Sequence, residues 1–219
     1  MGQEIDLMAN YPRPKRNVEE RGATKTDADR ALARKFGEEF FDGDRTHGYG
    51  GFNYQPRFWQ PVIPTFKAHW GLTSDSSVLD VGCAKGFMMH DFAELIPGIT
   101  VKGIDVSEYA VKNSIEDMRP HVDVADAKSL PYEDKSFDYV ISVTTIHNLE
   151  RAELVQSLRE IERVARLGSF ITVDAYRNDE EKERMLAWNL TAKTVLHVDE
   201  WKELFKEAGY SGDYYWFMP

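Results

Sequence analysis

The nine residues Val78–Gly86 constrain the fold more than any other stretch of the chain, because they change from strand-like to turn-like within one short run. An apolar segment leads into small residues, and a segment that can open a helix follows at Phe87. In a strand–turn–helix unit, small residues let a ligand approach the backbone, and the first helical amides face that ligand. The stretch therefore predicts a nucleotide site.

The spacing of the small residues narrows the class of nucleotide. A dinucleotide-binding turn has the pattern G-x-G-x-x-G. Here Gly82 and Ala84 fill the first two places, but Phe87 stands where the third glycine belongs. This spacing argues against a nicotinamide oxidoreductase.

The N-terminal residues differ in pattern from the rest of the chain. Residues 1–25 are polar and rich in charge, which predicts an extended arm with weak structure of its own. Apolar side chains then recur at helical spacing over Asp27–Phe41, and Thr26 or Asp27 can cap that helix. The glycine-rich, aromatic segment 42–54 is expected to form a mobile lid, although a plain linker would have the same composition. Pro56 begins a further helix, which later prolines divide into two pieces.

Short apolar segments alternate with helical patterns from residue 77 onward. Strands are expected at 77–81, 100–105, 122–125, 137–143, 169–174 and 214–218, and helices at 87–95, 107–118, 151–165, 180–190 and 199–208. This alternation implies an α/β fold with a doubly wound, mostly parallel sheet. We expect residues 1–75 to form an N-terminal arm, a helical cap and a lid loop, and residues 76–219 to form the α/β domain with an insert at 176–198.

Acidic residues follow the second and third expected strands. Asp105 ends the second strand, where a carboxylate can accept both ribose hydroxyls of a nucleotide; capping the next helix is its alternative role. Asp126 follows the third strand. Taken with the glycine turn, in this order and spacing, the segment from about 77 to 175 resembles the class I S-adenosylmethionine-dependent methyltransferases, with a Rossmann-like fold. One departure is Ala84, which stands where that family has a glycine.

The resemblance implies S-adenosyl-L-methionine as the cofactor and S-adenosyl-L-homocysteine as the product. It implies that Asp126 accepts a hydrogen bond from the adenine amino group and that the Ala127 amide meets a ring nitrogen. It also implies that Asp80 orients the turn and the amino group of the cofactor, while capping the turn's own amides is the alternative. Cys83 is expected to fill space. The expected cofactor-binding residues are Asp80, Gly82, Cys83, Ala84, Gly86, Asp105, Val106, Asp126, Ala127 and Val143.

The same family usually adds a seventh, antiparallel strand, for which the sequence leaves no separate segment. Either Thr194–His197 serves, or the sheet is one strand short and its edge is covered by the cap or by another subunit. Coverage of the edge by another subunit would make the protein a homodimer.

Methyl transfer from a sulfonium needs mainly alignment and removal of water, and a general base matters only for a hydroxyl or a charged amine. The acceptor should lie near the ends of the fourth and fifth strands, beneath the cap. His147 is the foremost candidate for acceptor contact or proton removal, with packing beside the cofactor as its alternative role. His47 and Tyr49 in the lid are the other catalytic candidates. Expected substrate contacts, with loop capping or core packing as alternatives, are Tyr54, Asp174, Tyr176, Arg177 and Trp188.

Composition narrows the range of partners. The formal charge of −10 argues against nucleic acid, whose binding depends on Lys and Arg neutralising phosphates. A single cysteine excludes an intrachain disulfide and a multi-cysteine zinc site, and the scattered histidines predict no metal site. We find no signal-peptide pattern and no run of membrane-spanning length, so we expect a cytoplasmic protein without a membrane partner.

These observations predict an enzyme that methylates an oxygen or nitrogen of a small polar metabolite, such as a sugar derivative, with S-adenosylmethionine. A methyltransferase acting on tRNA or protein is the first alternative, and a basic patch around Arg13–Arg16 would favour it. The second alternative is a non-catalytic nucleotide-binding module or a nicotinamide oxidoreductase, and Phe87 speaks against the oxidoreductase.

Overall fold

The computed structural model of the chain describes residues 2–13, 17–48 and 53–219. In the N-terminal region its helices are α1 (Val18–Thr24), α2 (Asp27–Ala33), α3 (Glu38–Phe41), α4 (Pro56–Trp59) and α5 (Ile63–Trp70). Strands and helices then alternate as β1 (Ser77–Val81), α6 (Phe87–Leu95), β2 (Thr100–Asp105), α7 (Glu108–Lys112), β3 (Val122–Val124), β4 (Phe137–Val143), α8 (Arg151–Val164), β5 (Ala165–Tyr176), α9 (Asp179–Trp188), β6 (Leu196–His197), α10 (Val198–Ala208) and β7 (Asp213–Phe217).

The strands form one sheet in the order β3-β2-β1-β4-β5-β6, and β7 also pairs with β5. All of these pairs are parallel. The chain runs outward from β1 to β2 and β3, and it then places β4 and β5 on the other side of β1. The expected doubly wound, parallel α/β sheet is therefore confirmed. Its order reverses between β1 and β4, and ligands of such sheets bind beyond the carboxyl ends of the strands at this point.

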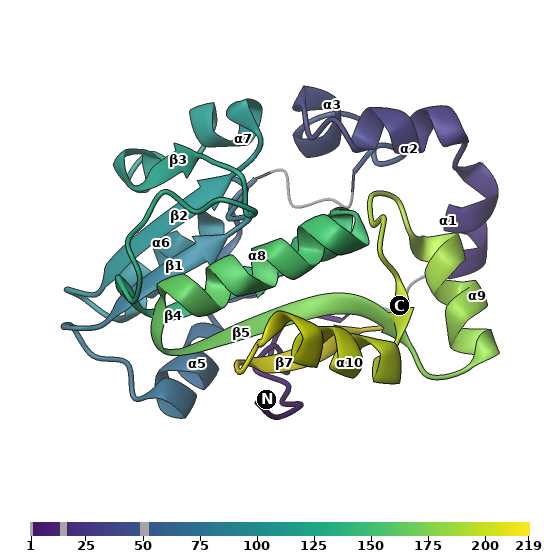
Figure 1. The fold of residues 1–219 in the computed structure, drawn as a ribbon. Helices are drawn as coiled ribbons and strands as arrows, with labels where there is room; N and C mark the ends of the chain where they lie inside the picture. The colour runs from purple at the N-terminus through teal and green to yellow at the C-terminus, as the bar shows by residue number, and fades with distance from the viewer. Residues whose placement is uncertain (1, 14–16, 49–52) are drawn as a thin grey trace.

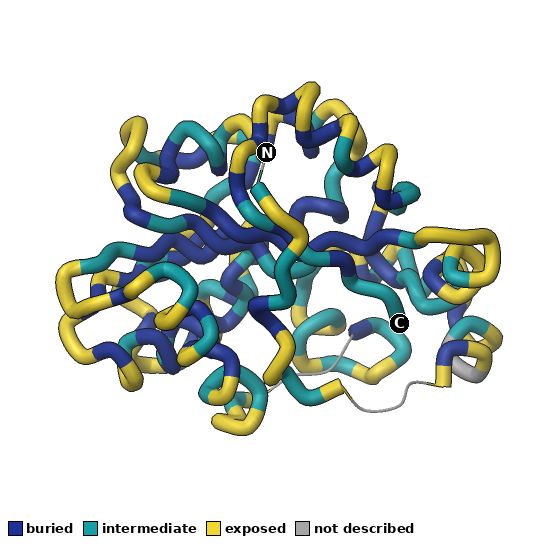
Figure 2. The backbone as a smooth tube through the Cα atoms, turned by 90° about the horizontal axis from the view of Figure 1, so that it is seen from below, coloured by how far each residue is buried: buried dark blue, intermediate teal, exposed yellow. Residues whose placement is uncertain are grey.

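Helices cover both faces of the sheet (Figure 1). On one face, α8 and α10 bury apolar side chains such as Leu158 and Trp201. On the other face, the ring of Phe66 in α5 contacts Phe170 of β5 and Phe92 of α6, with centroid distances of 5.3 and 5.9 Å. Figure 2 shows the strands as the buried centre of the molecule. The two cores hold the strand ends in fixed positions for a site.

The arm expected at the N-terminus has more structure than predicted. Val18–Thr24 form helix α1, which packs along α9, so weak structure is the wrong expectation there. Leu7 is buried in the core. The backbone N–H of Ile5 donates to the carbonyl of Tyr214 in β7 at 3.0 Å. Buried apolar contacts and backbone pairing therefore join this segment to the sheet domain.

The single helix expected over Asp27–Phe41 is divided into α2 and α3. Phe36 adopts a left-handed φ of 49°, which ends the first helical run. The predicted cap is confirmed, since Thr26 Oγ1 accepts from the amide of Asp29 at 3.1 Å. The predicted start at Pro56 and the division into two pieces, α4 and α5, are also confirmed.

The helix expected over 107–118 ends early, at Lys112. Its cap, Ser107, is confirmed, because the Ser107 hydroxyl accepts from the amide of Ala110 at 3.0 Å. Beyond the end, the amide of Ile115 donates to the carbonyl of Lys85 in the glycine turn at 2.9 Å. A contact with the turn thus replaces the continuing helical hydrogen bonds.

The additional strand for which the sequence left two alternatives is β6, which lies within the expected segment Thr194–His197. Leu196 and His197 pair with Ala175 and Tyr176 of β5. The pairing is parallel, so the antiparallel direction implied by the resemblance is wrong for this strand. A further bridge joins Glu4 to β7, so part of that strand's edge is covered by the chain's own N-terminal segment.

Candidate functional site

A cavity of about 1540 Å³ opens beyond the carboxyl ends of β1, β2, β4 and β5. Its floor consists of residues at or just after these strand ends, and its walls come from the N-terminal helices and from β7. Nine of the expected cofactor-binding residues line it: Asp80, Gly82, Cys83, Ala84, Asp105, Val106, Asp126, Ala127 and Val143. The tenth, Gly86, instead caps the N-terminus of α6 with a φ of 77°. The cavity thus lies where the strand order reverses, as expected for this class of sheet.

The turn between β1 and α6 needs unusual backbone angles. Gly82 has a φ of 85°, and a Cβ atom there would lie 2.2 Å from the side chain of Thr145. A side chain at this position would therefore collide with the loop after β4. Ala84 also has a positive φ, of 51°. A left-handed conformation costs an ordinary L-residue about 1–2 kcal/mol, so alanine keeps this turn only under strain.

Asp105 holds this turn from the end of β2. One carboxylate oxygen accepts from the amide of Ala84 at 2.8 Å, and the other accepts from the amide of Ser107 at 2.8 Å. Burial raises the pKa of Asp105, while these amide donors act in the opposite direction. The capping role is therefore real. A carboxylate has about four acceptor sites, so Asp105, which lines the cavity, can also receive ribose hydroxyls.

Asp80 is the least satisfied carboxylate of the floor. It is buried at the end of β1, and no hydrogen bond to it is found within the described part of the chain. Burial, together with the nearby charge of Asp105, raises the pKa of Asp80 to about 7. A buried carboxylate without donors is costly, and a cation bound beside it would relieve that cost. The side chain therefore fits the ammonium group of an amino-acid-bearing cofactor.

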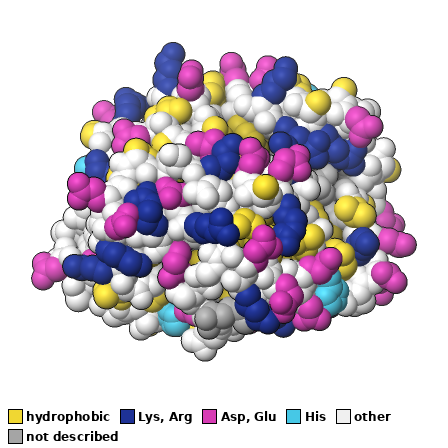
Figure 3. Space-filling view, in the orientation of Figure 1, with side chains coloured by type: hydrophobic (Ala, Val, Ile, Leu, Met, Phe, Trp, Pro, Cys, Tyr) yellow, Lys and Arg dark blue, Asp and Glu magenta, His cyan; other side chains and the backbone are white. Residues whose placement is uncertain are grey.

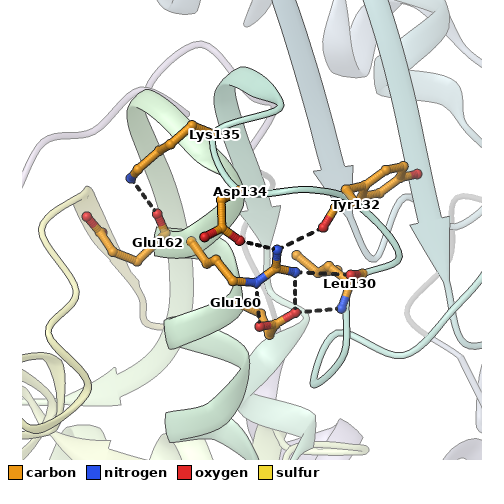
Figure 4. Close-up of polar contacts among 7 residues, drawn as sticks. Leu130, Tyr132, Asp134, Lys135, Glu160 and Glu162 are labelled. Carbon is orange, nitrogen blue, oxygen red and sulfur yellow. Dashed lines mark hydrogen bonds and ion pairs between the residues drawn. The ribbon is translucent and has the colours of Figure 1, made fainter.

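The loop that carries Asp126 and Ala127 is fixed by an arginine of α8. Arg163 donates to the carbonyls of Leu130 and Tyr132 at 3.1 and 2.8 Å (Figure 4). It also pairs with Asp134 and Glu160 at 2.8 and 2.7 Å. The Asp126 carboxylate itself accepts from the amide of Lys128 at 3.0 Å. Asp126 keeps acceptor capacity at the cavity wall, where an adenine amino group could donate.

His147 lies in a short 3-10 helix, Ile146–Asn148, directly after β4. It is buried and lines the cavity, and its Nδ1 accepts from the amide of Asp174 at 3.0 Å. Burial lowers the pKa of His147, although the Asp174 carboxylate opposes this effect. In the neutral ring an accepting Nδ1 leaves the proton on Nε2. In this tautomer Nε2 of His147 is a hydrogen-bond donor, and Nδ1 is already occupied by the Asp174 amide.

The other predicted catalytic and substrate-binding residues divide into two groups. Asp174, Arg177 and Trp188 line the cavity together with His147. His47 does not line it but pairs with Asp29 at 3.0 Å, and Tyr176 lies against the ring of His197 at 5.7 Å. Tyr49 lies outside the described residues.

Tyr54, expected to contact substrate, instead contacts helix α6. Its hydroxyl donates to Asp91 at 2.5 Å, and its ring lies 4.7 Å from that of His90. Side-chain ligand atoms of His90, Asp91 and Glu94 lie within 4.8 Å of one another, although the sequence predicts no metal site. His90 Nδ1 lies 2.6 Å from a carboxylate oxygen of Asp117. These contacts join the end of the 42–54 loop to the sheet domain.

Aromatic side chains of the cavity wall were missed from the sequence. They are Tyr11, Phe36, Phe40, Phe41, Phe58, Trp59, Phe87, Tyr215, Trp216 and Phe217. The helical spacing of several of them favours a buried apolar face, and that pattern cannot distinguish a core from the wall of a ligand cavity. The concentration of aromatic residues at 36–59 and 215–217 was a signal available in the sequence.

Helix α3 is fastened to the cofactor side of the cavity. The ammonium group of Lys85, within the glycine turn, lies 2.5 and 2.6 Å from the carboxylate oxygens of Asp42. Tyr109 of α7 donates to the same carboxylate at 2.7 Å. The Ser107 hydroxyl donates to the carbonyl of Phe36 at 2.5 Å. We call these three contacts, Lys85–Asp42, Tyr109–Asp42 and Ser107–Phe36, the α3 latch.

Known proteins resemble the chain over the region that builds the cavity floor. The family described as "Methyltransferase domain" matches residues 72–209. The chain is 30% identical over 156 residues to an uncharacterized protein from Haemophilus influenzae, covering 65% of this chain and 61% of that protein. It is 30% identical over 154 residues to 27-O-demethylrifamycin SV methyltransferase from Amycolatopsis mediterranei, covering 63% and 55%. The chain thus aligns with only 55–61% of the length of these relatives.

Solved structures share the fold. A methyltransferase in complex with the Trm112 methyltransferase activator, from Haloferax volcanii, gives a TM-score of 0.54 at 20% identity, covering 90% of this chain and 77% of that chain. The YcgJ protein from Bacillus subtilis gives a TM-score of 0.54 at 18% identity, covering 67% and 66%. Since the family match spans more than half of the chain and includes the glycine turn, Asp105 and Asp126, the chain belongs to the class I S-adenosylmethionine-dependent methyltransferases.

Proposed function

We propose that the protein transfers the methyl group of S-adenosylmethionine to an oxygen or nitrogen atom of a small-molecule acceptor. The observation that carries the proposal is the convergence of Asp80, Asp105 and Asp126 around one strained turn at the floor of one cavity. Three carboxylates so placed can accept hydrogen bonds from the ammonium group, the ribose hydroxyls and the adenine amino group of one ligand.

The bound cofactor supplies an activated methyl group, so the chain's own residues mainly bind, orient and exclude water. Asp80 would pair with the ammonium group, which would remove the cost of an unpaired buried charge. Asp105 would accept from the ribose hydroxyls while its amide partners keep the turn in place. Asp126 would accept from the adenine amino group, and the Arg163 contacts would keep its loop rigid.

On the side of this floor proposed for the acceptor, His147 follows β4, and Asp174 lies near the carboxyl end of β5. We propose that the Nε2 proton of His147 orients an acceptor oxygen or carbonyl, because its other nitrogen is already occupied by the Asp174 amide. Proton removal by His147 is disfavoured on the same ground. A neutral nucleophile, or one that loses its proton after transfer, needs no base at this position.

A small acceptor is supported by the cavity at the strand ends and by relatives named for small-molecule substrates. Besides the rifamycin enzyme, norajmaline N-methyltransferase from Rauvolfia serpentina is 33% identical over 108 residues, covering 46% of this chain and 36% of that protein. On the face that Figure 3 shows, basic side chains are interspersed with acidic ones, which does not favour a polyanion such as tRNA. The sugar derivative suggested by the sequence remains a prediction.

Other expectations also remain predictions: the cytoplasmic location, the homodimer, and the division into a cap of residues 1–75 and a domain of residues 76–219 with its insert at 176–198. Across the described ranges, each helix is too short or too polar to cross a membrane.

Calorimetry with S-adenosylhomocysteine tests the proposal directly. We expect one molecule to bind per chain, and we expect Asp105→Ala and Asp126→Ala each to weaken binding at least tenfold. Asp75→Ala, an exposed acid before β1, is the matched control and should bind normally. A titration with reduced nicotinamide dinucleotide should give no heat. Failure of S-adenosylhomocysteine to bind to the folded protein would refute the proposed function.

A further inference from the structure

Charge is segregated inside the cavity. Among the described residues, the cofactor side carries Asp80, Asp105 and Asp126, and its one basic residue, Lys85, is paired with Asp42. The rest of the lining carries Arg13, Lys25, Arg45, Arg57 and Arg177 against Asp44 and Asp174. Of these cations, Arg13 and Arg177 also pair with Asp6 and Glu4, at 2.7 and 3.4 Å. The whole chain has a formal charge of −10, so its composition alone would not place a basic wall here.

Basic side chains of this wall lie over its aromatic rings. The guanidinium of Arg13 is 5.6 Å from the ring centre of Tyr215, and that of Arg57 is 4.9 Å from Phe58. The ammonium of Lys25 is 5.7 Å from the ring of Trp188. Cations within about 6 Å of a ring centre are attracted to its face, so each ring helps to hold its cation in position.

The rings also contact one another across different parts of the chain. Tyr11, which precedes α1, lies 5.6 Å from Phe58 and 4.9 Å from Trp59 of α4. Trp188, at the end of α9, lies 6.3 Å from Phe217 of β7. Segments near both ends of the chain therefore supply one wall in which flat apolar surfaces alternate with positive charge.

Lys25 is the most deeply placed of these cations. The residue is 8% exposed, and its ammonium donates to the carbonyl of Trp188 at 2.7 Å. Charge-assisted hydrogen bonds are stronger than neutral ones, and attraction to an anion grows as the local dielectric falls. Arg57, by contrast, is exposed. The two residues therefore allow the same charge effect to be tested at a buried and at an exposed position.

We infer that the methyl acceptor is a flat, aromatic molecule carrying an anionic group. This inference rests on the proposed function and deepens it. The rings would contact the acceptor's apolar faces, with which aromatic side chains pack favourably. The basic wall would bind the anionic group, while the acidic floor around Asp80 and Asp105 would repel it. The anionic end would thereby point away from the cofactor, and the opposite end would face the methyl group.

The test uses the full chain saturated with S-adenosylhomocysteine and two matched pairs of probes. The pairs are 4-hydroxybenzoate with 4-hydroxybenzamide, and indole-3-acetate with indole-3-acetamide. Each pair has nearly the same shape and differs in charge. We expect at least one acid to bind tenfold or more tightly than its amide at low ionic strength, and this preference should shrink as salt is added, because salt screens charge pairs.

Variants then assign the preference to the wall. Arg57→Gln and Lys25→Met should each reduce the acid-to-amide ratio at least threefold. Lys35→Met makes the same chemical change at an exposed residue that does not line the cavity, and it should leave the ratio unchanged. If Lys25→Met fails to fold by circular dichroism, Arg57→Gln decides alone.

Equal affinity for acid and amide in both pairs, no measurable binding of either acid, or an unchanged ratio in the folded wall variants would overturn the inference. Binding of S-adenosylhomocysteine is measured first in each sample. If it binds and the acids show no preference, the acceptor inference fails and the proposed function stands. If it does not bind, the proposed function itself fails.

Discussion

Replacing Asp80 with asparagine should make the empty protein more stable while weakening its affinity for cofactor. Burial and the neighbouring Asp105 raise the pKa of Asp80 from 3.8 to about 7. The folded state therefore binds a proton more readily than the unfolded chain. The stabilising contribution of this proton is complete below pH 3.8, and it is lost as the pH rises through about 7. At pH 8 the wild-type protein carries the full penalty of a buried charge.

The difference between the two pKa values sets the size of this penalty. At about 1.4 kcal/mol per pKa unit, it corresponds to about 4 kcal/mol. An asparagine amide must find its own partners at the cavity wall, which offsets part of the gain. We therefore expect Asp80→Asn to raise the free energy of unfolding by about 2–3 kcal/mol at pH 8. The gain should fall by about 2 kcal/mol, to about 0–1 kcal/mol, at pH 5.5, where the wild-type carboxyl is largely protonated when folded.

Urea unfolding of both proteins at pH 5.5 and pH 8 measures this change, and calorimetry measures S-adenosylhomocysteine affinity, which should drop at least tenfold. Asp105→Asn is the control, because both Asp105 oxygens already accept from amides. One of these amides would lose its acceptor, at a cost of about 1–3 kcal/mol. This cost offsets the relief of the buried charge that raises the pKa of Asp105, so stability should not rise as it does for Asp80→Asn. An Asp80→Asn protein that is less stable than wild type at pH 8, or a gain independent of pH, would refute the reasoning.

Substitutions at three further positions test other features of the site. Ala84→Gly should raise the free energy of unfolding by about 0.5–1 kcal/mol, because relief of left-handed strain exceeds the extra entropy of the unfolded glycine; a loss measured in urea would contradict the strain. His147→Gln should keep most stability by accepting from the Asp174 amide, whereas His147→Leu should lose about 1–3 kcal/mol, so equal melting temperatures would exclude this role. Arg163→Met should speed hydrogen exchange in residues 130–135 and weaken S-adenosylhomocysteine binding; unchanged exchange would show that the loop needs no such support.

Much of the fold follows from local sequence signals. The strands at 77–81, 100–105 and 137–143 are confirmed at their predicted bounds, because each is an apolar run with turn residues on both sides. The helix expected at 107–118 was too long, because the sequence shows helical spacing but not that Ile115 donates to Lys85. The end of that helix is therefore set by a contact between distant segments, which local spacing does not reveal.

In the candidate site, too, local sequence signals predict one part, and contacts between distant segments determine the rest. The cofactor side follows strand ends, so Asp80, Asp105 and Asp126 could be placed from sequence alone. The acceptor side depends on how α4, α9 and β7 meet, and no local pattern encodes that meeting. His47 and Tyr54 were therefore assigned to the site from a composition typical of lids, whereas they pair with Asp29 and Asp91. Aromatic residues such as Tyr11 were left out because only contacts with distant segments bring them to the cavity.

The α3 latch has a consequence for kinetics. It joins the glycine turn of the cavity floor to α3, so exchange of the proposed cofactor should require the Lys85–Asp42 and Ser107–Phe36 contacts to open. The dwell time of product on the protein would then follow the lifetime of the latch rather than the depth of the cavity. Because one of these contacts is an ion pair, turnover limited by product escape should accelerate in moderate salt.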